Sequence, residues 1–217
     1  MDNKLDIAKV EEFEISSGYL VILDPSNHKL KPNNGYKTKA LNGTWVGYII
    51  QDPRTELNHK ATQLHLEHKN FDSIIESEDI LRPVDILLLV DSTCIVICDL
   101  ETFGNQDIGE KWFSDRPGAR LLHPDDFWYS MVLFKSIFNS AGAFPGGYSV
   151  STPIDKIYNV HVLEDSRGNT VSVDINFKAP AITEELTKLA LDKSIIEEGE
   201  CEVDSRGFFY IVDSPKL

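Results

Sequence analysis

Three histidines stand close together in the first third of the chain, at His59, His65 and His68, and Glu67 lies between the last two. Side chains of this kind could hold a zinc ion if they converged on one point. The alternating leucines around them predict a β-strand, which points His65 and His68 to opposite faces. A helix would place these two histidines on one face, but the alternation favours the strand. We therefore interpret them as surface histidines, and we predict no metal site and no cofactor.

A second candidate for chemistry is the stretch His123–Asp126, where a histidine stands beside Asp125 and Asp126. A histidine next to carboxylates could carry out acid–base catalysis. The same carboxylates could instead cap the helix predicted to follow them. The chain has no G-x-S-x-G, no phosphate-binding glycine loop, no H-E-x-x-H and no paired C-x-x-C. The sequence therefore favours a protein without catalytic residues, and it leaves the question of an enzyme open.

A long stretch rich in glycine and proline, Glu101–His123, precedes this helix, and loops of this length are often functional. Aromatic side chains in and after it could stack on a ligand. The sequence thus predicts a ligand site for a small molecule or nucleotide, which the protein binds or hydrolyses. Its predicted residues are Trp112, His123, Asp125, Trp128 and Tyr129.

The three cysteines are Cys94, Cys98 and Cys201. On a strand, Cys94 and Cys98 would share a face about 13 Å apart, too far for a disulfide or a shared metal. We interpret these two as buried structural thiols. Acidic neighbours of Cys201 raise a thiol pKa and disfavour a nucleophile there. The odd number of cysteines and an N-terminus without an apolar segment predict a reduced, cytoplasmic protein.

The net charge of the chain favours some classes of binding partner over others. The chain has 35 acidic and 21 basic residues and a net charge of −14. This balance disfavours nucleic acid and anionic membranes, and the longest apolar run, Ile86–Val90, is too short to span a bilayer. It fits a partner protein with a basic surface, although the charge could serve solubility alone.

The acidic residues are dense between positions 181 and 205, where eight of them accompany two lysines. This segment could be a solvated helix face or an acidic docking surface. The predicted partner-binding residues are Glu184, Glu185, Glu197, Glu198 and Glu200.

One phrase occurs three times, as "ISSGYLVILDP" from Ile15, "VDSTCIVICDL" from Val90 and "VDSRGFFYIVDSP" from Val203. It predicts a turn opened by a serine, then a strand, then an aspartate that ends the strand. Common turn chemistry explains the repetition. The alternative is that the related strands pair in one sheet and gather their aspartates at one edge, where a hard cation could bind.

The remaining patterns define the fold. Runs of β-forming residues predict about nine strands, mostly in hairpin-like order, and two main helices, within Asp125–Gly142 and from Thr183. Within the first helix, Phe127, Met131, Phe134, Ile137 and Phe138 predict the stripe that faces the core. Both apolar strands between Asp85 and Asp99 are predicted to be covered on both faces. The predicted fold is α+β with a largely antiparallel β-sheet, bent or in a sandwich, made by one domain over residues 15–217 after a polar lead-in over residues 1–14.

Several of these motifs carry a resemblance. "SGYLVILDP", "VDSTCIVICDL", "WFSD…FWYSM" and "STPIDKIYNVHV…VSVDINF", in this order, resemble uncharacterised bacterial and phage-associated families of unknown function, whose pattern runs G-Y-L-x-I-x-D-P, V-D-S-G and G-D-G-x-Y. This chain departs from that pattern at Thr93 and at Ile154–Lys156, which replace glycines. The resemblance implies a partner or antagonist in bacterial conflict systems and no established chemistry.

Together these observations favour a non-enzymatic interaction protein, of the acidic inhibitor or immunity type, that binds a basic protein. The alternative is the small-molecule or nucleotide-binding protein with its site near the loop at residues 101–123. A third hypothesis is a structural homo-oligomer without a ligand.

Overall fold

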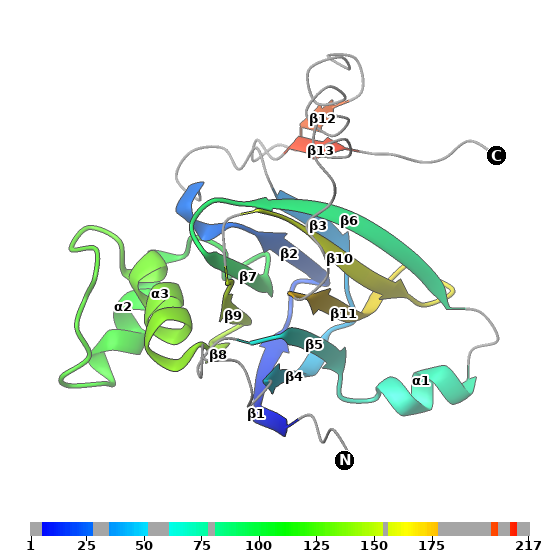
Figure 1. The fold of residues 1–217 in the computed structure, drawn as a ribbon, viewed down its shortest axis with the longest axis horizontal. Helices are drawn as coiled ribbons and strands as arrows, with labels where there is room; N and C mark the ends of the chain where they lie inside the picture. Colours follow the sequence, from blue (N-terminus) through cyan, green and yellow to red (C-terminus); the bar gives the residue numbers. More distant parts are fainter. Residues whose placement is uncertain are drawn as a thin grey trace.

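The protein folds as the α+β structure with antiparallel sheets that its sequence predicts (Figure 1). The computed structural model describes residues 6–27, 35–51, 61–77, 81–153, 156–177, 201–203 and 209–211. A six-stranded sheet has the order β1 (Asp6–Ile15), β4 (Gly43–Gln51), β5 (Gln63–His68), β11 (Thr170–Asn176), β10 (Lys156–Glu164) and β6 (Arg82–Val90). A five-stranded sheet has the order β3 (Gly35–Lys39), β2 (Tyr19–Leu23), β7 (Cys94–Asp99), β9 (Gly147–Ser151) and β8 (Ala141–Phe144).

The helices and a small hairpin complete the described structure. β12 (Cys201–Val203) pairs with β13 (Phe209–Ile211). The helices are a 3-10 turn η1 (Pro25–Asn27), α1 (Phe71–Ser77), α2 (Gln106–Ser114) and α3 (Phe127–Asn139). The second main helix predicted from Thr183 and the five glutamates predicted to bind a partner lie outside the described residues.

The core has two parts, which arrange the molecule in three layers. The inner faces of the two large sheets meet in one hydrophobic cluster, to which β5 contributes Leu64 and Leu66 and β7 contributes Ile95 and Ile97. The opposite face of the five-stranded sheet packs against α2 and α3 in a second cluster. Figure 1 shows these two helices side by side at the left, next to β7, β8 and β9. The six-stranded sheet therefore has one face that the described helices α2 and α3 do not cover.

Strands β6 and β7 follow one another along the chain but enter different sheets. Every residue of β7 is buried, as predicted for a strand covered on both faces. The same prediction for β6 is wrong, because β6 is the edge strand of its sheet and its alternate residues are exposed. Leu87 and Leu89 of β6 are 52% and 39% exposed.

Three further expectations are corrected. Asp6–Ile15, most of it predicted as a polar lead-in, is strand β1, because its register with β4 buries Phe13 and Ile15 while its glutamates stay on the other side or at the rim. The stretch predicted as one irregular loop contains α2, which Asn105 caps by accepting the backbone N–H groups of residues 107 and 108. In α3 the predicted core residue Ile137 is 58% exposed, and the left-handed residue that ends the helix is Ser140, not Gly142.

The repeated phrase is explained by the sheet order. The strands of the first and second copies, β2 and β7, lie side by side and pair antiparallel. The segment from β1 to β5 and the segment from β6 to β11 occupy corresponding positions in the two sheets. In the six-stranded sheet β1, β4 and β5 correspond to β6, β10 and β11, and in the five-stranded sheet β2 and β3 correspond to β7 and β9. The second segment differs by the insertion of α2, α3 and β8 after β7. The left-handed turn before β2 is at Gly18, with a φ of 75°, and the corresponding turn before β7 is at Thr93, with a φ of 55°. The two halves thus have the same architecture.

Candidate functional site

Two of the aromatic residues predicted to stack on a ligand are core residues. Trp128 is fully buried and Trp112 is 3% exposed, both in the cluster between the helices and the five-stranded sheet. The Trp112 ring contacts Phe134, at 5.4 Å between ring centroids, and the guanidinium carbon of Arg116 lies over the Trp112 ring, 4.3 Å from its centroid. In this conformation the two indoles stabilise the helical layer.

The other three residues of that predicted site lie nearer the surface. His123 and Asp125 are exposed, and Tyr129 is half-buried. The rings of His123 and Tyr129 lie 4.7 Å apart at an angle of 37°. Burial, followed by the charges of nearby groups, raises the pKa of Tyr129 to about 12. The structure therefore brings the rings of His123 and Tyr129 together near the surface, whereas Trp112 and Trp128 lie in the core.

The aspartates of the repeated phrase do not gather at one edge, so the hypothesis of a shared cation site at Asp24 and Asp99 is wrong. Antiparallel pairing of β2 and β7 places Asp24 and Asp99 at opposite ends of the pair. Each accepts backbone hydrogen bonds at a turn. Among the described residues, no three side chains of His, Cys, Asp or Glu form a group that could hold a metal ion.

The clearest polar cluster lies on the outer face of the six-stranded sheet, opposite the core. One row of paired residues crosses this sheet from edge to edge. It includes no residue of the predicted ligand site. The row consists of Val10, Tyr48, His65, Asp174, His161 and Asp85.

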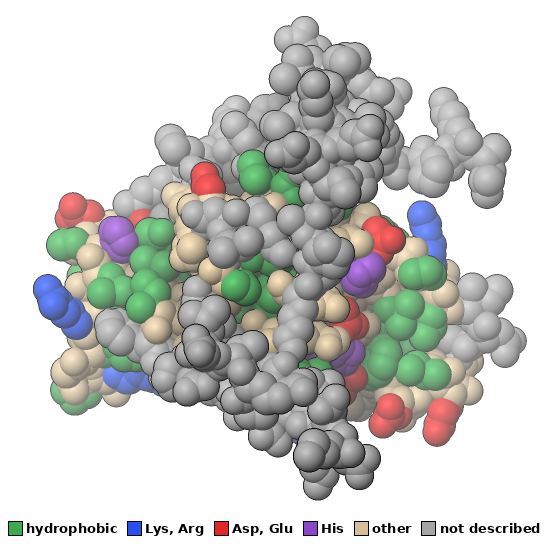
Figure 2. Space-filling model, viewed as in Figure 1, with side chains coloured by type: hydrophobic (Ala, Val, Ile, Leu, Met, Phe, Trp, Pro, Cys, Tyr) green, Lys and Arg blue, Asp and Glu red, His purple; other side chains and the backbone are tan. Residues whose placement is uncertain are grey.

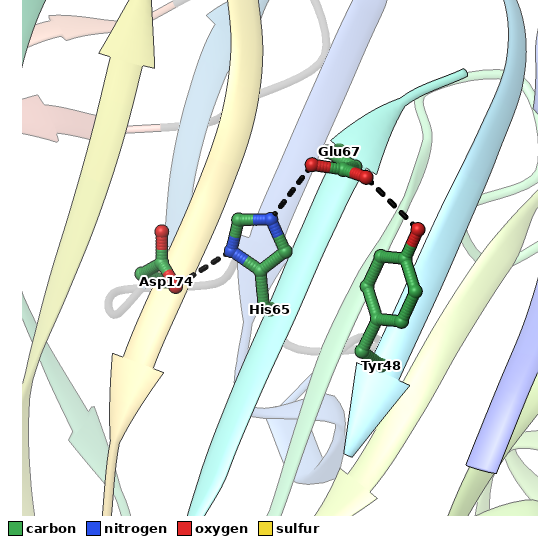
Figure 3. Close-up of polar contacts among 4 residues, drawn as sticks. All are labelled: Tyr48, His65, Glu67 and Asp174. Atoms are coloured by element: carbon green, nitrogen blue, oxygen red, sulfur yellow. Dashed lines mark hydrogen bonds and ion pairs between the residues drawn. The ribbon is translucent and has the colours of Figure 1, made fainter. Parts of the chain in front are cut away.

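His65 is held between two carboxylates in the middle of this row (Figure 3). Its Nδ1 lies 2.7 Å from Asp174 of β11, and its Nε2 lies 3.0 Å from Glu67, two residues along β5. The second oxygen of Glu67 accepts a hydrogen bond of 2.9 Å from the hydroxyl of Tyr48 on β4. Three adjacent strands therefore fix one connected network.

The electrostatics of the network define its protonation. Burial alone would lower the pKa of His65, but the hydrogen bonds to Asp174 and Glu67 outweigh burial and raise the pKa to about 9. Both ring nitrogens then donate, so His65 is an imidazolium at neutral pH. Burial and the hydrogen bond to Glu67 raise the pKa of Tyr48. A doubly bonded imidazolium has no free lone pair, so His65 does not serve as a general base at neutral pH. It holds Glu67 and Asp174 in fixed positions on the sheet.

His161 and Asp85 form a second pair at the β6 end of the row, joined by a hydrogen bond between Nδ1 and Oδ1. On the β1 side, Glu12 of the same face bonds Lys69 at 3.0 Å. Figure 2 shows acidic and histidine side chains gathered beside hydrophobic ones in the right-hand part of the view. The outer face thus combines charged and apolar groups on a rigid sheet.

The strand prediction correctly separates His65 from His68, but the interpretation of His68 as a surface histidine is wrong, because the strand turns it towards the core. His68 is 7% exposed and lies on the inner side, where its Nε2 is 3.2 Å from the carbonyl of Asn42. His59 lies outside the described residues. The contact between His65 and Asp174 is not evident from the sequence, because 109 positions separate the two residues. The one signal that the sequence offered was that both are charged residues within alternating apolar strands.

The thiols of Cys94 and Cys98 are free and buried, as predicted. Burial raises the pKa of Cys94 to about 12 and raises that of Cys98 further. These two thiols are therefore unsuited to nucleophilic chemistry in the folded protein.

Among the described helices, none has the length and apolar character needed to cross a membrane. Comparison of the chain with protein-family models, with curated proteins and with solved structures finds no match to any of them.

Proposed function

We propose that this chain is a non-enzymatic interaction protein that binds a basic protein partner through the outer face of the six-stranded sheet. The observation that carries the proposal is the charge of that face. Among the described residues, this face presents five carboxylates, which are set against Lys69 and the protonated His65. The five carboxylates belong to Glu12, Glu14, Glu67, Asp85 and Asp174.

Preorganisation supports this proposal. The carboxylates of Glu67 and Asp174 are fixed by His65, so little side-chain entropy is lost when a partner binds them. Asp85, at 66% side-chain exposure, and Glu12, at 52%, remain accessible to a basic group. Val10, at 56%, and Tyr48 add apolar surface beside these charges. Interfaces of this kind combine an apolar contact area with charges that steer association.

The net charge of −14 adds to the attraction of a basic partner at a distance. The specific version of the proposal is an inhibitor or immunity-type protein, in which the acidic face covers the basic functional surface of its partner. The resemblance of the repeated motifs to phage-associated proteins favours this version.

The experiment is an affinity capture from the native lysate, followed by calorimetry with the identified partner at low and high salt. The double variant Glu12→Lys/Asp85→Lys reverses two charges on the outer face. Its matched control, Glu101→Lys/Glu110→Lys, makes the same change in net charge at exposed positions of the helical end. We expect wild type and control to bind a basic protein, with an affinity that falls as salt rises, and the outer-face variant to lose at least tenfold in affinity.

Equal binding by both variants would contradict the outer face as the contact. Loss in the control variant alone would move the contact to the α2 end of the molecule. Retention of the partner without any dependence on salt would refute the role of charge.

A second candidate is the small-molecule or nucleotide-binding protein. The observation in its favour is the contact between the exposed His123 and the tilted ring of Tyr129, with the exposed Asp125 two residues after His123. Mass spectrometry of small molecules extracted from the purified protein tests it, with Tyr129→Leu as the variant. A metabolite retained by wild type and lost by the variant would favour this candidate over the protein partner.

A further inference from the structure

The two edges of the six-stranded sheet are protected to different extents. β1 has an irregular register between Ile7 and Lys9. Near its middle, Glu11 accepts hydrogen bonds from the backbone N–H of Ala143 in β8 and from Lys135 of α3. Bulges, charges and covering elements are the devices that stop an edge strand from pairing with another chain. The β1 edge has all three.

β6 is the opposite edge, and within the described part of the chain it has almost none of these devices. Its nine residues pair with β10 on one side, and no other described strand pairs with it. Pro83 is the second residue of the strand, so the donors of Val84–Val90 are intact. Within Val84–Val90 the one charged residue is Asp85, which bonds His161 of the neighbouring strand. Figure 1 shows β6 as the long strand along the upper right margin of the sheet.

The side chains of β6 indicate what would pair with it. Leu87 and Leu89 lie on the outer face and are exposed, whereas Leu88 and Val90 face the core. Suppose that β6 of a second copy pairs antiparallel with β6 of the first, so that the two Leu87 residues lie opposite each other. Outer-face residues then lie opposite outer-face residues, and core-facing residues lie opposite core-facing residues. Val84 then meets Val90 and Ile86 meets Leu88 at the rim of the core, and Asp85 meets Leu89 on the outer face. No two like charges are opposed, and Leu87 is covered.

From this self-complementarity we propose that two copies of this chain associate through β6, which joins their six-stranded sheets into one continuous antiparallel sheet. The symmetry is that of an isologous dimer, in which the same strand serves both subunits. A strand from an unrelated basic protein fits this edge less well, since Asp85 is the one charged residue of Val84–Val90 and it already bonds His161. The outer faces of both copies lie on the same side, so the dimer doubles the acidic face. The dimer itself does not depend on the function proposed for that face.

A single strand pair with a few side chains gives a small interface, which is expected to be transient. The first test is therefore sedimentation equilibrium of the full chain from about 1 to 500 µM, a range that spans weak dimerisation. We expect the mass to rise from one chain towards two. We expect Leu87→Asp, which places two carboxylates opposite each other, to stay monomeric. The control Ile137→Asp changes an isoleucine of similar exposure on α3, and we expect it to dimerise as wild type does.

The second test locates the contact directly. In a Cys201→Ser background the native cysteines that remain are the buried Cys94 and Cys98. We expect Leu87→Cys to form a covalent dimer with a short bis-maleimide at a concentration where wild type dimerises, and Val10→Cys and Ile137→Cys to form none. Wild type that stays monomeric at 500 µM would overturn the proposal. So would a dimer that crosslinks through Val10→Cys or Ile137→Cys, or one that Leu87→Asp leaves intact.

Discussion

Asp24 and Asp99 each close the turn that begins the other's strand. Asp99, at the end of β7, accepts the backbone N–H groups of Ser16 and Ser17, which lead into β2. Asp24, at the end of β2, accepts those of Asp91 and Ser92, which lead into β7, at 2.7 and 2.9 Å. The second oxygen of each carboxylate accepts the N–H two residues further on, at Glu101 and Ser26. In these two copies of the repeated phrase, the aspartate that ends each strand therefore fixes the turn that begins the adjacent strand.

Replacement of either aspartate by asparagine should destabilise the protein by about 2–3 kcal/mol, since a charged acceptor of several buried hydrogen bonds is lost and an amide N–H would face two donors. The two sites lie at opposite ends of the strand pair, so the double variant should lose the sum of the two effects to within about 0.5 kcal/mol. Urea denaturation at pH 7 measures this. The control is Glu110→Gln on the exposed face of α2, which should change the free energy of unfolding by less than about 0.5 kcal/mol.

The dependence of these losses on pH has a defined sign. Burial raises the pKa of both aspartates, but the hydrogen bonds from the turns outweigh burial and lower it. A lowered folded-state pKa gives stability that is present above the unfolded-state value of about 4 and lost as pH falls through the folded-state value. The difference between wild type and Asp24→Asn should therefore shrink in acid. A difference that stays constant down to pH 2 would contradict the role of the ionised carboxylate.

The His65 network should make the protein less stable in mild alkali. Because its folded-state pKa of about 9 lies above the ordinary value near 6.5, its contribution is fully present below about pH 6.5 and is lost as pH rises through 9. Partial exposure of the ring reduces the effect, which we expect to be on the order of 1–2 kcal/mol. Urea denaturation between pH 6 and pH 10 measures it. His65→Gln should flatten the profile in this range, and a profile that this variant leaves unchanged would contradict the role of the network.

Gly18 and Thr93 occupy the same left-handed position in the two halves. We therefore expect substitutions at these two positions to change the stability of the protein in opposite directions. Gly18→Thr should lower stability by about 1–2 kcal/mol through backbone strain alone, since the nearest atom to an added Cβ is Asn42 Oδ1 at 3.8 Å. Thr93→Gly relieves that strain and should be neutral or stabilising by up to about 1 kcal/mol after the entropy of glycine is included. Thermal unfolding of both variants checks the pair. Two changes of the same sign would show that backbone strain does not govern these positions.

At Gly109 in α2, we expect the usual effect of a glycine-to-alanine substitution on helix stability to change sign. Replacing a helical glycine by alanine usually gains about 0.5–1 kcal/mol. An added Cβ at Gly109 would lie 2.5 Å from the carbonyl carbon of Phe127 and from the nitrogen of Trp128, so the backbones of α2 and α3 would have to separate. We expect Gly109→Ala to lose about 1–3 kcal/mol, as overpacked sites do. The control is Glu110→Ala, at the next residue of α2, which is exposed. A Gly109→Ala variant that is more stable than wild type would refute the close approach of the helices.

The sequence determined the local elements well where one period dominated. The alternation around Leu64 and Leu66 gave a strand and separated His65 from His68, because successive side chains of a strand point to opposite faces. The apolar run from Cys94 to Asp99 correctly indicated a strand covered on both sides. The pattern did not predict the exposure of β6, since a run of leucines can occur in an edge strand as well as in a central strand. It also failed for α2, where the cap at Asn105 and the close packing of Gly109 stabilise a helix whose composition resembles a loop.

What the tertiary structure alone decided is which distant residues meet. The repeated phrase by itself indicated a turn, a strand and an aspartate, but not that Asp24 would bind the turn before β7 or Asp99 the turn before β2. Nor could spacing along the chain show that His65 lies between Glu67 and Asp174, or that Tyr48 joins them. Local patterns arise from the conformational preferences and burial of neighbouring residues, which the sequence contains directly. Strand order depends on how all the elements share one core, so the network on the outer face and the place of β6 at the edge of its sheet appear only when the whole chain has folded.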